Sequence, residues 1–246
     1  MKFSLYYYAG STLVFGVLYG VLPSAFTIPL VALCLCIFAY NENNRYATFI
    51  ATGMLFSAFG DISLRLENGN FLVFLCGVVN YLIAHLCYIR AYLLSGIDFT
   101  GRLNSGLFFL AYCGTMLVIL SPGVDFVLIP AVVVYAMIIC TMAFMASCRF
   151  RMMEIDRVSR STALAGSLVF LASDTILSIN RFHGHVWQAD LIIWITYCIG
   201  QMLIAMSAKT PYRGAIGSDS DEGEADALKS DDSSNTSPLL AHSVSF

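Results

Sequence analysis

Long apolar runs separated by short polar segments alternate along the first 210 residues of this chain. A helix needs about 20 consecutive apolar residues to cross the hydrocarbon core of a bilayer, and eight runs reach or approach that length. We therefore expect an all-α fold, a polytopic transmembrane helix bundle of about eight spans over residues 1–210. The predicted spans are 3–22, 24–40, 46–66, 70–94, 105–121, 124–147, 161–181 and 187–208.

The first two runs are separated only by Pro23, which predicts a tight helical hairpin. A cleaved signal peptide is the alternative interpretation, because Lys2 precedes an apolar stretch that ends at the small residues Ser24 and Ala25. Seven spans would then remain.

The basic residues predict how the bundle is oriented, since short cytosolic loops carry an excess of Lys and Arg. With eight spans and a cytosolic N-terminus, all but two of the 13 Lys and Arg residues face the cytosol. The two exceptions are Arg65 and Arg181. We therefore expect both termini to lie in the cytosol.

Composition supports a membrane protein, because 58% of the residues are hydrophobic and only 12% are charged, against about a quarter charged in soluble domains. The net charge is -3 and no basic block occurs, so we expect no nucleic-acid partner. The eight cysteines form no C-x-x-C pair, and His183 and His185 alone are a weak metal signal. We predict neither a metal nor a cofactor.

Residues 211–246 differ from the rest, because they are rich in Ser, Asp and Glu and have few apolar side chains. This composition predicts a disordered, acidic, cytosolic tail. Its segment 237–240, Ser-Pro-Leu-Leu, resembles a dileucine sorting signal, although a purely solubilising tail is the alternative. The location therefore stays open between the endoplasmic reticulum and endolysosomal membranes.

Two carboxylates interrupt the predicted spans, Asp61 in SAFGDISL and Asp174 in FLASDTIL. An ionisable group at that depth costs at least ~2.5 kcal/mol on insertion scales, so it normally faces a bundle interior or a water-filled cavity. Spans 46–66 and 161–181 cross in the same direction, which puts both aspartates roughly 20 Å from the cytosolic border. We expect them to face one cavity below the non-cytosolic surface.

A purely structural interpretation is also available for each aspartate. Asp61 has Arg65 one helical turn away, and Asp174 has hydroxyl and amide groups nearby at Thr175, Ser178 and Asn180.

Other polar side chains lie in the predicted spans. His85 is the one histidine inside a span and Tyr88 follows it by about one turn, while Tyr197 and Gln201 are four apart and share a helix face. Hydrogen bonds that only hold helices together are the alternative role for all four. Counting along span 70–94 puts His85 and Tyr88 roughly 10 Å from the level of the aspartates, so we expect contact only if that helix is strongly tilted.

Four motifs occur in order along the chain, FSAFGD, AHLCYIRAY, LVFLASDTILSINRF and TYCIGQMLIAMSA. Together they resemble the lysoplasmalogenase family, also called the YhhN-like family of multi-span membrane proteins, over about residues 46–208. The resemblance implies hydrolysis of the vinyl ether bond of a lysoplasmalogen, which releases a fatty aldehyde and glycerophosphoethanolamine or glycerophosphocholine. The partners it implies are a lysophospholipid substrate and the surrounding membrane lipid.

The chemistry of a vinyl ether fits two buried carboxyl groups. The bond resists base but yields to acid, so the reaction needs a carboxylic acid that is protonated near neutral pH and a second carboxylate. Burial and a neighbouring carboxylate both favour the protonated form. We therefore expect Asp61 and Asp174 to be catalytic. Arg65 and Arg181 could hold the phosphate, and the alternative is that they only snorkel to the membrane interface. The remaining candidates for substrate binding or support are His85, Tyr88, Asn180, Tyr197 and Gln201.

Two other function classes remain open, a proton-coupled transporter and a non-catalytic lipid-binding membrane protein. A transporter also buries acids, but Pro29 and Pro130, which would mark broken helices, lie away from both aspartates. An intramembrane aspartyl protease does not fit, because Ala58 occupies the first glycine position of G-x-G-D and no Tyr-Asp pair occurs. The sequence gives no indication of an oligomeric state.

Overall fold

The computed structural model describes residues 44–208, and this part of the chain is all-α, as predicted. Its six long helices are each long and apolar enough to cross a membrane, so the protein is a multi-pass membrane protein. The helices are α3 (Arg45–Leu66), α4 (Phe71–Leu94), α5 (Leu103–Leu120), α6 (Ile129–Phe150), α7 (Arg157–Ser178) and α8 (Ala189–Met206). Predicted spans 3–22 and 24–40, the signal-peptide alternative and the tail 211–246 lie outside the described residues.

Short turns of tighter or wider helix connect the long helices at one end of the bundle. They are the 3-10 turns η1 (Ser121–Gly123) and η2 (Phe126–Leu128), and the π-helical turn η3 (Ile179–His183). We call the end formed by the α3–α4 turn and these three elements the cavity end. Wide π-helical turns are rare in proteins, but those that do occur are often found at functional sites.

Local side-chain chemistry explains where two helices begin. Helix α6 starts at Ile129 rather than near 124 because η1 and η2 precede it, and Pro130 stands in its first turn, where a missing N–H costs nothing. Helix α7 starts at Arg157, four residues before the predicted span, because the Asp156 carboxylate accepts hydrogen bonds from the N–H groups of Val158 and Ser159.

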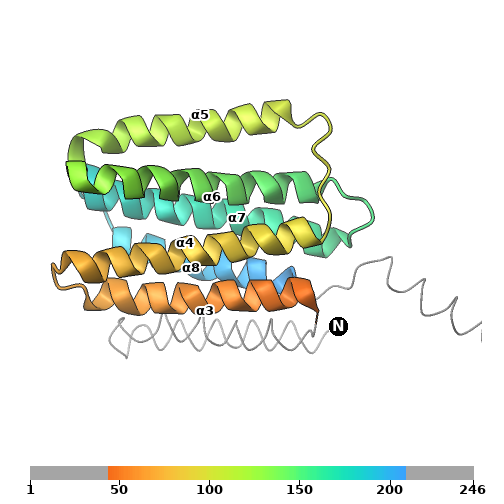
Figure 1. Cartoon of the computed structure of the whole chain (residues 1–246), viewed down its shortest axis with the longest axis horizontal. Helices are drawn as coiled ribbons and strands as arrows, with labels where there is room; N and C mark the ends of the chain where they lie inside the picture. The colour runs from red at the N-terminus through yellow and green to blue at the C-terminus, as the bar shows by residue number, and fades with distance from the viewer. Residues whose placement is uncertain (1–43, 209–246) are drawn as a thin grey trace, which may run out of the picture.

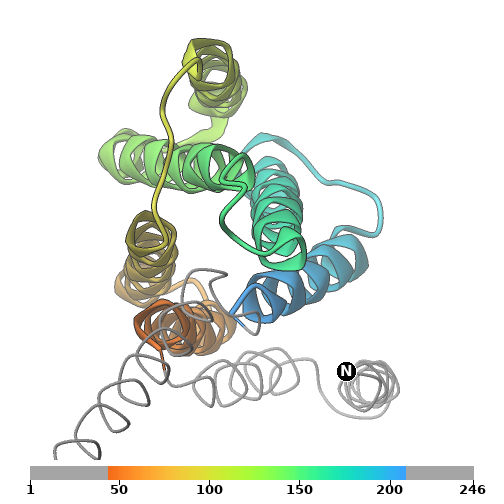
Figure 2. The same cartoon turned by 90° about the vertical axis from the view of Figure 1, so that its right-hand side faces the viewer.

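Five helices surround a common interior, seen end-on in Figure 2. Helices α3, α4, α6, α7 and α8 form a closed ring, because each packs against two of the others. Helix α5 lies outside this ring and packs mainly on α6. In Figure 1, α5 is the outermost described helix at the top of the view. The ring encloses the polar side chains discussed below.

Close backbone approach holds α7 against α8. A Cβ atom on Gly166 would lie 2.8 Å from the Ile204 nitrogen and 2.9 Å from the Gly200 carbonyl oxygen, so only glycine fits there. Small residues at such contacts are typical of helix pairs in membranes, where close packing replaces the hydrophobic effect between helices.

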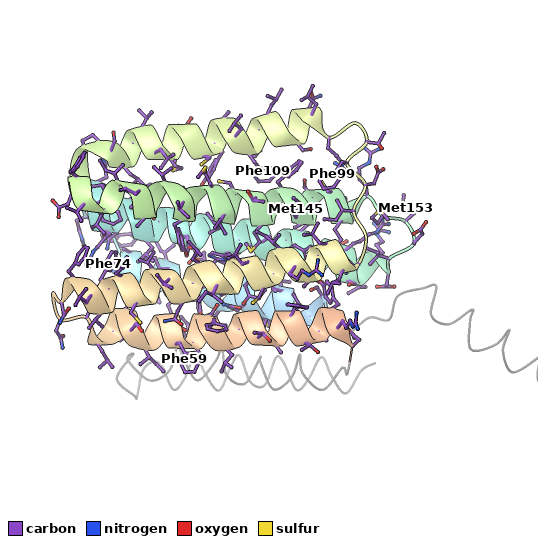
Figure 3. All side chains as sticks on the ribbon, in the orientation of Figure 1. Phe59, Phe74, Phe99, Phe109, Met145 and Met153 are labelled. Atoms are coloured by element: carbon purple, nitrogen blue, oxygen red, sulfur yellow. The ribbon has the colours of Figure 1, made fainter. Side chains whose placement is uncertain are left out.

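Large apolar side chains cover the outer faces, whereas several polar side chains are buried inside. Phe59 on α3 is 47% exposed and points away from the other described helices in Figure 3. By contrast, His85 and Gln201 have no exposed surface. This arrangement suits a bundle surrounded by lipid, in which polar groups find partners in the interior.

Arg149 is one of the basic residues that the sequence analysis assigned to the cytosolic side. It lies in the last turn of α6 and is buried, only 2% exposed. Its guanidinium group donates hydrogen bonds to the Ser95 hydroxyl and to the carbonyl and hydroxyl oxygens of Ser159, and it lies 4.6 Å from the ring centroid of Tyr46. These contacts join α3, α4, α6 and α7 at the end of the bundle opposite the cavity.

Candidate active site

A cavity of about 290 Å³ lies inside the ring at the cavity end. All five ring helices and η3 contribute to its wall, and both intramembrane aspartates, Asp61 on α3 and Asp174 on α7, line it. The expectation that they face one cavity therefore agrees with the geometry. The other polar residues in the wall are Arg65, Glu67, Tyr81, Tyr135, Ser173, Ser178, Arg181, Asp190 and Tyr197, among mainly apolar side chains.

Asp61 is held by two tyrosine hydroxyl groups. Tyr81 of α4 donates a hydrogen bond to Oδ1, and Tyr197 of α8 donates one to Oδ2 at 2.8 Å. Gly60 makes the first contact possible, because a Cβ atom there would lie 2.8 Å from the Tyr81 ring. The carboxyl group is thus fixed from both sides, with 5% of the residue exposed.

A chain of hydrogen bonds runs from Asp61 deeper into the ring. The Gln201 side-chain amide donates to the Tyr197 hydroxyl at 3.3 Å, and the Tyr88 hydroxyl donates to Oε1 of Gln201 at 2.9 Å. Ser57 completes the chain, with its hydroxyl 3.4 Å from that of Tyr88. Because the donors from Tyr88 onward all point toward Asp61, each bond polarises the next. Tyr88, Tyr197 and Gln201 therefore belong to one network.

Asp174 has a different set of neighbours. The Tyr135 hydroxyl of α6 donates to Oδ2, and Nε2 of His85 lies 3.1 Å from that hydroxyl and 3.7 Å from Oδ2 itself. Since the Tyr135 proton goes to Asp174, a neutral His85 would donate its Nε2 proton to the Tyr135 oxygen. The other ring nitrogen, Nδ1, is buried without a hydrogen-bond partner in the described part of the chain.

The sequence analysis placed His85 roughly 10 Å from the level of the aspartates and expected contact only with a strongly tilted helix, whereas the structure brings His85 to 3.7 Å from Asp174. Side chains of a helix lean toward its N-terminus, and α4 runs antiparallel to α7. His85 therefore leans toward the cavity end while Asp174 leans away from it, and the two meet at 3.7 Å. Tyr88, one turn deeper, is linked to Asp61 through Gln201 and Tyr197.

Charged side chains gather at the mouth of the cavity. Arg181 of η3 forms an ion pair of 2.6 Å with Glu67, which follows α3, and its guanidinium group lies 4.8 Å from the centroid of the Phe74 ring. Arg65 and Asp190 also line the cavity. Both basic residues that the sequence analysis assigned to the non-cytosolic side are therefore at this site.

Two of the residues that the sequence analysis considered around Asp174 have other partners. The Asn180 side chain accepts a hydrogen bond from the Val186 N–H at 3.0 Å and shapes the α7–α8 connection; it is not part of the cavity wall. The Thr175 hydroxyl donates to the Leu171 carbonyl and pairs with the Tyr112 hydroxyl at 2.6 Å.

Sequence reasoning missed Tyr81, Tyr135 and Glu67. A signal existed for the first, since Tyr81, His85 and Tyr88 follow the spacing i, i+4, i+7 and so share one helix face. Tyr135 stands alone as a hydroxyl in the apolar run AVVVYAM. Glu67 looked like an ordinary loop carboxylate, and only the fold brings it to Arg181. Within residues 44–208, no group of three His, Cys, Asp or Glu side chains is arranged to hold a metal ion.

Comparison with known proteins gives consistent matches. A family model described as the YhhN family matches residues 24–208. Lysoplasmalogenase TMEM86A of Homo sapiens is 30% identical over 163 residues, which cover 66% of this chain and 65% of the human protein. Lysoplasmalogenase TMEM86A of Bos taurus is 31% identical over 165 residues, with the same coverage of 66% and 65%.

A third relative matches over a longer segment. Lysoplasmalogenase TMEM86B of Sus scrofa is 31% identical over 180 residues, which cover 73% of this chain and 72% of the pig protein. No solved structure is significantly similar to the chain.

Proposed function

This chain belongs to the YhhN family, and we propose that within it the protein is a lysoplasmalogenase-like ether hydrolase. The reaction is hydrolysis of the vinyl ether bond of a lysoplasmalogen to a fatty aldehyde and glycerophosphoethanolamine or glycerophosphocholine. Three relatives named lysoplasmalogenase support the proposal. The human and bovine matches span 65% of the length of those proteins.

One observation carries the proposal: two aspartates from different helices line one cavity in a bundle surrounded by lipid. Hydrolysis of a vinyl ether needs an acid that donates a proton to carbon and a base that receives one from water. Two carboxyl groups that differ in their hydrogen-bond partners are suited to taking opposite roles. Asp61 has two tyrosine donors, whereas Asp174 has Tyr135 with His85 behind it.

In the proposed first step, one aspartic acid gives its proton to the alkene carbon remote from the ether oxygen. The π electrons form the new C–H bond, and the adjacent carbon becomes an oxocarbenium ion that the second, ionised aspartate stabilises. Water then attacks this carbon and loses a proton to the second aspartate, which gives a neutral hemiacetal.

In the second step the hemiacetal collapses. Its hydroxyl proton returns to the first aspartate, the bond to the glycerol oxygen breaks, and that oxygen takes the proton held by the second aspartate. Aldehyde and alcohol leave, and both carboxyl groups recover their starting states, so no cofactor is needed.

The substrate would lie with its phosphate near Arg65 and Arg181 at the mouth and its scissile bond at the aspartates. The hydrogen bonds described above would position the two carboxyl groups; they come from Tyr81, Tyr135, Tyr197, His85 and Gln201. Tyr88 would hold Gln201 in place through its own hydrogen bond to Oε1. We further propose that both termini face the cytosol and that the protein resides in the endoplasmic reticulum or endolysosomal membrane.

The decisive experiment uses the purified full-length protein in detergent. It is incubated with a lysoplasmalogen and, separately, with the saturated ether analogue of the same chain length and head group. Aldehyde release from the vinyl ether alone is the expected result. Absence of aldehyde from a folded, lipid-binding protein would refute the hydrolase proposal and favour a non-catalytic lipid-binding role.

A proton-coupled transporter remains the competing proposal, and the interior below the cavity argues against it. Tyr88, Gln201 and Tyr92 have no exposed surface, and the Tyr92 hydroxyl bonds to that of Ser167 at 2.9 Å. These packed side chains fill the ring beneath the aspartates, where a transporter needs a second route. Proton-dependent uptake into proteoliposomes would overturn this preference.

A further inference from the structure

The mouth of the cavity carries an equal number of positive and negative side chains. Arg65 and Arg181 provide the positive charges, and Glu67 and Asp190 the negative ones. A purely anionic ligand would be repelled by the two acids, and a neutral ligand would offer no charge to any of the four groups. A zwitterionic ligand, with an anionic and a cationic group close together, matches this arrangement.

Of the four charged residues at the mouth, Glu67 has a buried side-chain atom without a hydrogen-bond partner in the described part of the chain. Its Oε1 atom accepts a hydrogen bond from Arg181 at 2.6 Å, whereas its Oε2 atom is buried and has no hydrogen-bond partner within residues 44–208. Buried carboxylate oxygens almost always have a donor, because leaving one desolvated and unpaired is costly. Glu67 lines the cavity. Protein atoms cover Oε2, so the Glu67 side chain must turn toward the cavity for a bound ligand to supply that donor.

The two possible head groups differ in the number of N–H donors that their cationic group carries. The primary ammonium of phosphoethanolamine carries three N–H donors, like a lysine side chain, whereas the trimethylammonium of phosphocholine carries none. In either head group two carbons separate the phosphate oxygen from the nitrogen. A phosphate bound by Arg181 would therefore bring the nitrogen next to Glu67, the ion-pair partner of Arg181.

Recognition of choline usually depends on stacked aromatic faces. Phe74 is one of the aromatic residues in the cavity wall, and the Arg181 guanidinium group already lies over its ring, 4.8 Å from the centroid. That ring face is therefore engaged before a quaternary ammonium group arrives.

We propose that Glu67 and Arg181 form a head-group site in which Glu67 Oε2 accepts a hydrogen bond from a primary ammonium group, so that ethanolamine lysolipids are preferred over choline lysolipids. This inference rests on the proposed function, since it assigns the head-group end of the same substrate. Glu67 and Arg181 select the substrate here; the reacting atoms lie deeper, at the aspartates.

The test compares kcat/KM for ethanolamine and choline lysoplasmalogens of equal chain length. Glu67→Gln keeps an oxygen for Arg181 but replaces the Oε2 acceptor with an N–H donor. We expect it to lower kcat/KM about 10-fold for the ethanolamine substrate and less than about 3-fold for the choline substrate, the scale of one hydrogen bond to a charged group. Arg181→Gln should lower both values together, because the phosphate is common to both.

Asp125→Asn is the matched control, because it removes a carboxylate at the same end of the bundle, in an exposed connection outside the cavity wall. It should leave the ethanolamine-to-choline ratio unchanged. Equal losses on both substrates in Glu67→Gln, or a ratio that shifts as much in Asp125→Asn, would overturn the head-group assignment.

A binding measurement separates this inference from the proposed activity. Saturated lysophosphatidylethanolamine and lysophosphatidylcholine have no vinyl ether, so their dissociation constants in detergent do not depend on turnover. We expect tighter binding of the ethanolamine lipid by the unmodified protein, and loss of that difference in Glu67→Gln. The same affinity for both lipids in the unmodified protein would refute the head-group site even if aldehyde release is observed. If no aldehyde is released, the binding difference still tests the site.

Discussion

Nε2 of His85 lies 3.7 Å from Oδ2 of Asp174, and the hydroxyl of Tyr135 is within hydrogen-bond distance of both atoms. His85 is completely buried, so its ring is fixed by packing, and Tyr135 in turn fixes the carboxyl group. A histidine that acts through Tyr135 has a positioning role, which mutagenesis can separate from a merely space-filling one.

Replacing His85 by Gln or by Leu tests that role. Gln can place an N–H donor near the position of Nε2, whereas Leu fills the space without a donor. We expect His85→Leu to lower kcat roughly 10- to 100-fold, the cost of a hydrogen bond to a charged group, and His85→Gln to stay within about 5-fold of the parent protein. Steady-state aldehyde release measures both. Equal losses would mean that only the shape of the ring matters.

Asp61→Asn and Asp174→Asn test the two carboxyl groups directly. Each should lower turnover by at least about 100-fold, the usual contribution of a general acid or base, because the amide neither donates nor accepts the transferred proton. Size-exclusion profiles and melting temperatures in detergent should match those of the parent protein and of the Asp125→Asn control. Activity near the parental level in both variants would rule out the two-carboxylate mechanism.

Glycine at position 166 should be required for stability. A Cβ atom there would come within 2.9 Å of backbone atoms of α8, so Gly166→Ala should destabilise the bundle by about 1 to 3 kcal/mol, the cost of overpacking. Gly114→Ala on α5 is the control, since a Cβ atom there meets nothing within 4 Å. Thermal unfolding in detergent compares the two, and an equal melting temperature for both would contradict the packing seen between α7 and α8.

The acidic C-terminal segment should be dispensable for catalysis. A chain that ends at Lys209 retains every residue of the cavity wall, so its kcat and KM should equal those of the full-length protein, while its location in cells is free to change. A truncated protein that binds detergent normally yet fails to turn over substrate would show that the tail contributes to the site.

Both termini should be accessible from the cytosol. Protease added to sealed vesicles with the cytosolic face outward should remove a tag placed after Phe246 and equally a tag placed before Met1. Protection of both tags would mean that the bundle is inverted. An accessible C-terminal tag with the N-terminal tag already lost would mean that the first apolar run is a cleaved signal peptide.

The sequence by itself was sufficient to predict the six long helices of residues 44–208 and to single out Asp61 and Asp174 as unusual. Apolar runs of about 20 residues predict spans because an unpaired backbone polar group is too costly in lipid, and α3, α4 and α8 match their predicted ranges within two residues at each end. Asp61 and Asp174 stood out for a related reason: a charge among apolar neighbours has a free-energy cost visible in the sequence.

Only the tertiary structure decided which side chains meet. Tyr81 and Tyr135 look like ordinary residues of apolar spans, and Glu67 looks like a loop carboxylate, until packing brings them to Asp61, Asp174 and Arg181. Counting residues gives the depth of a Cα atom along its own helix, but it omits the direction in which the side chain leans. In antiparallel helices those directions are opposite, which is why His85 reaches Asp174 from a level where the sequence placed it out of range.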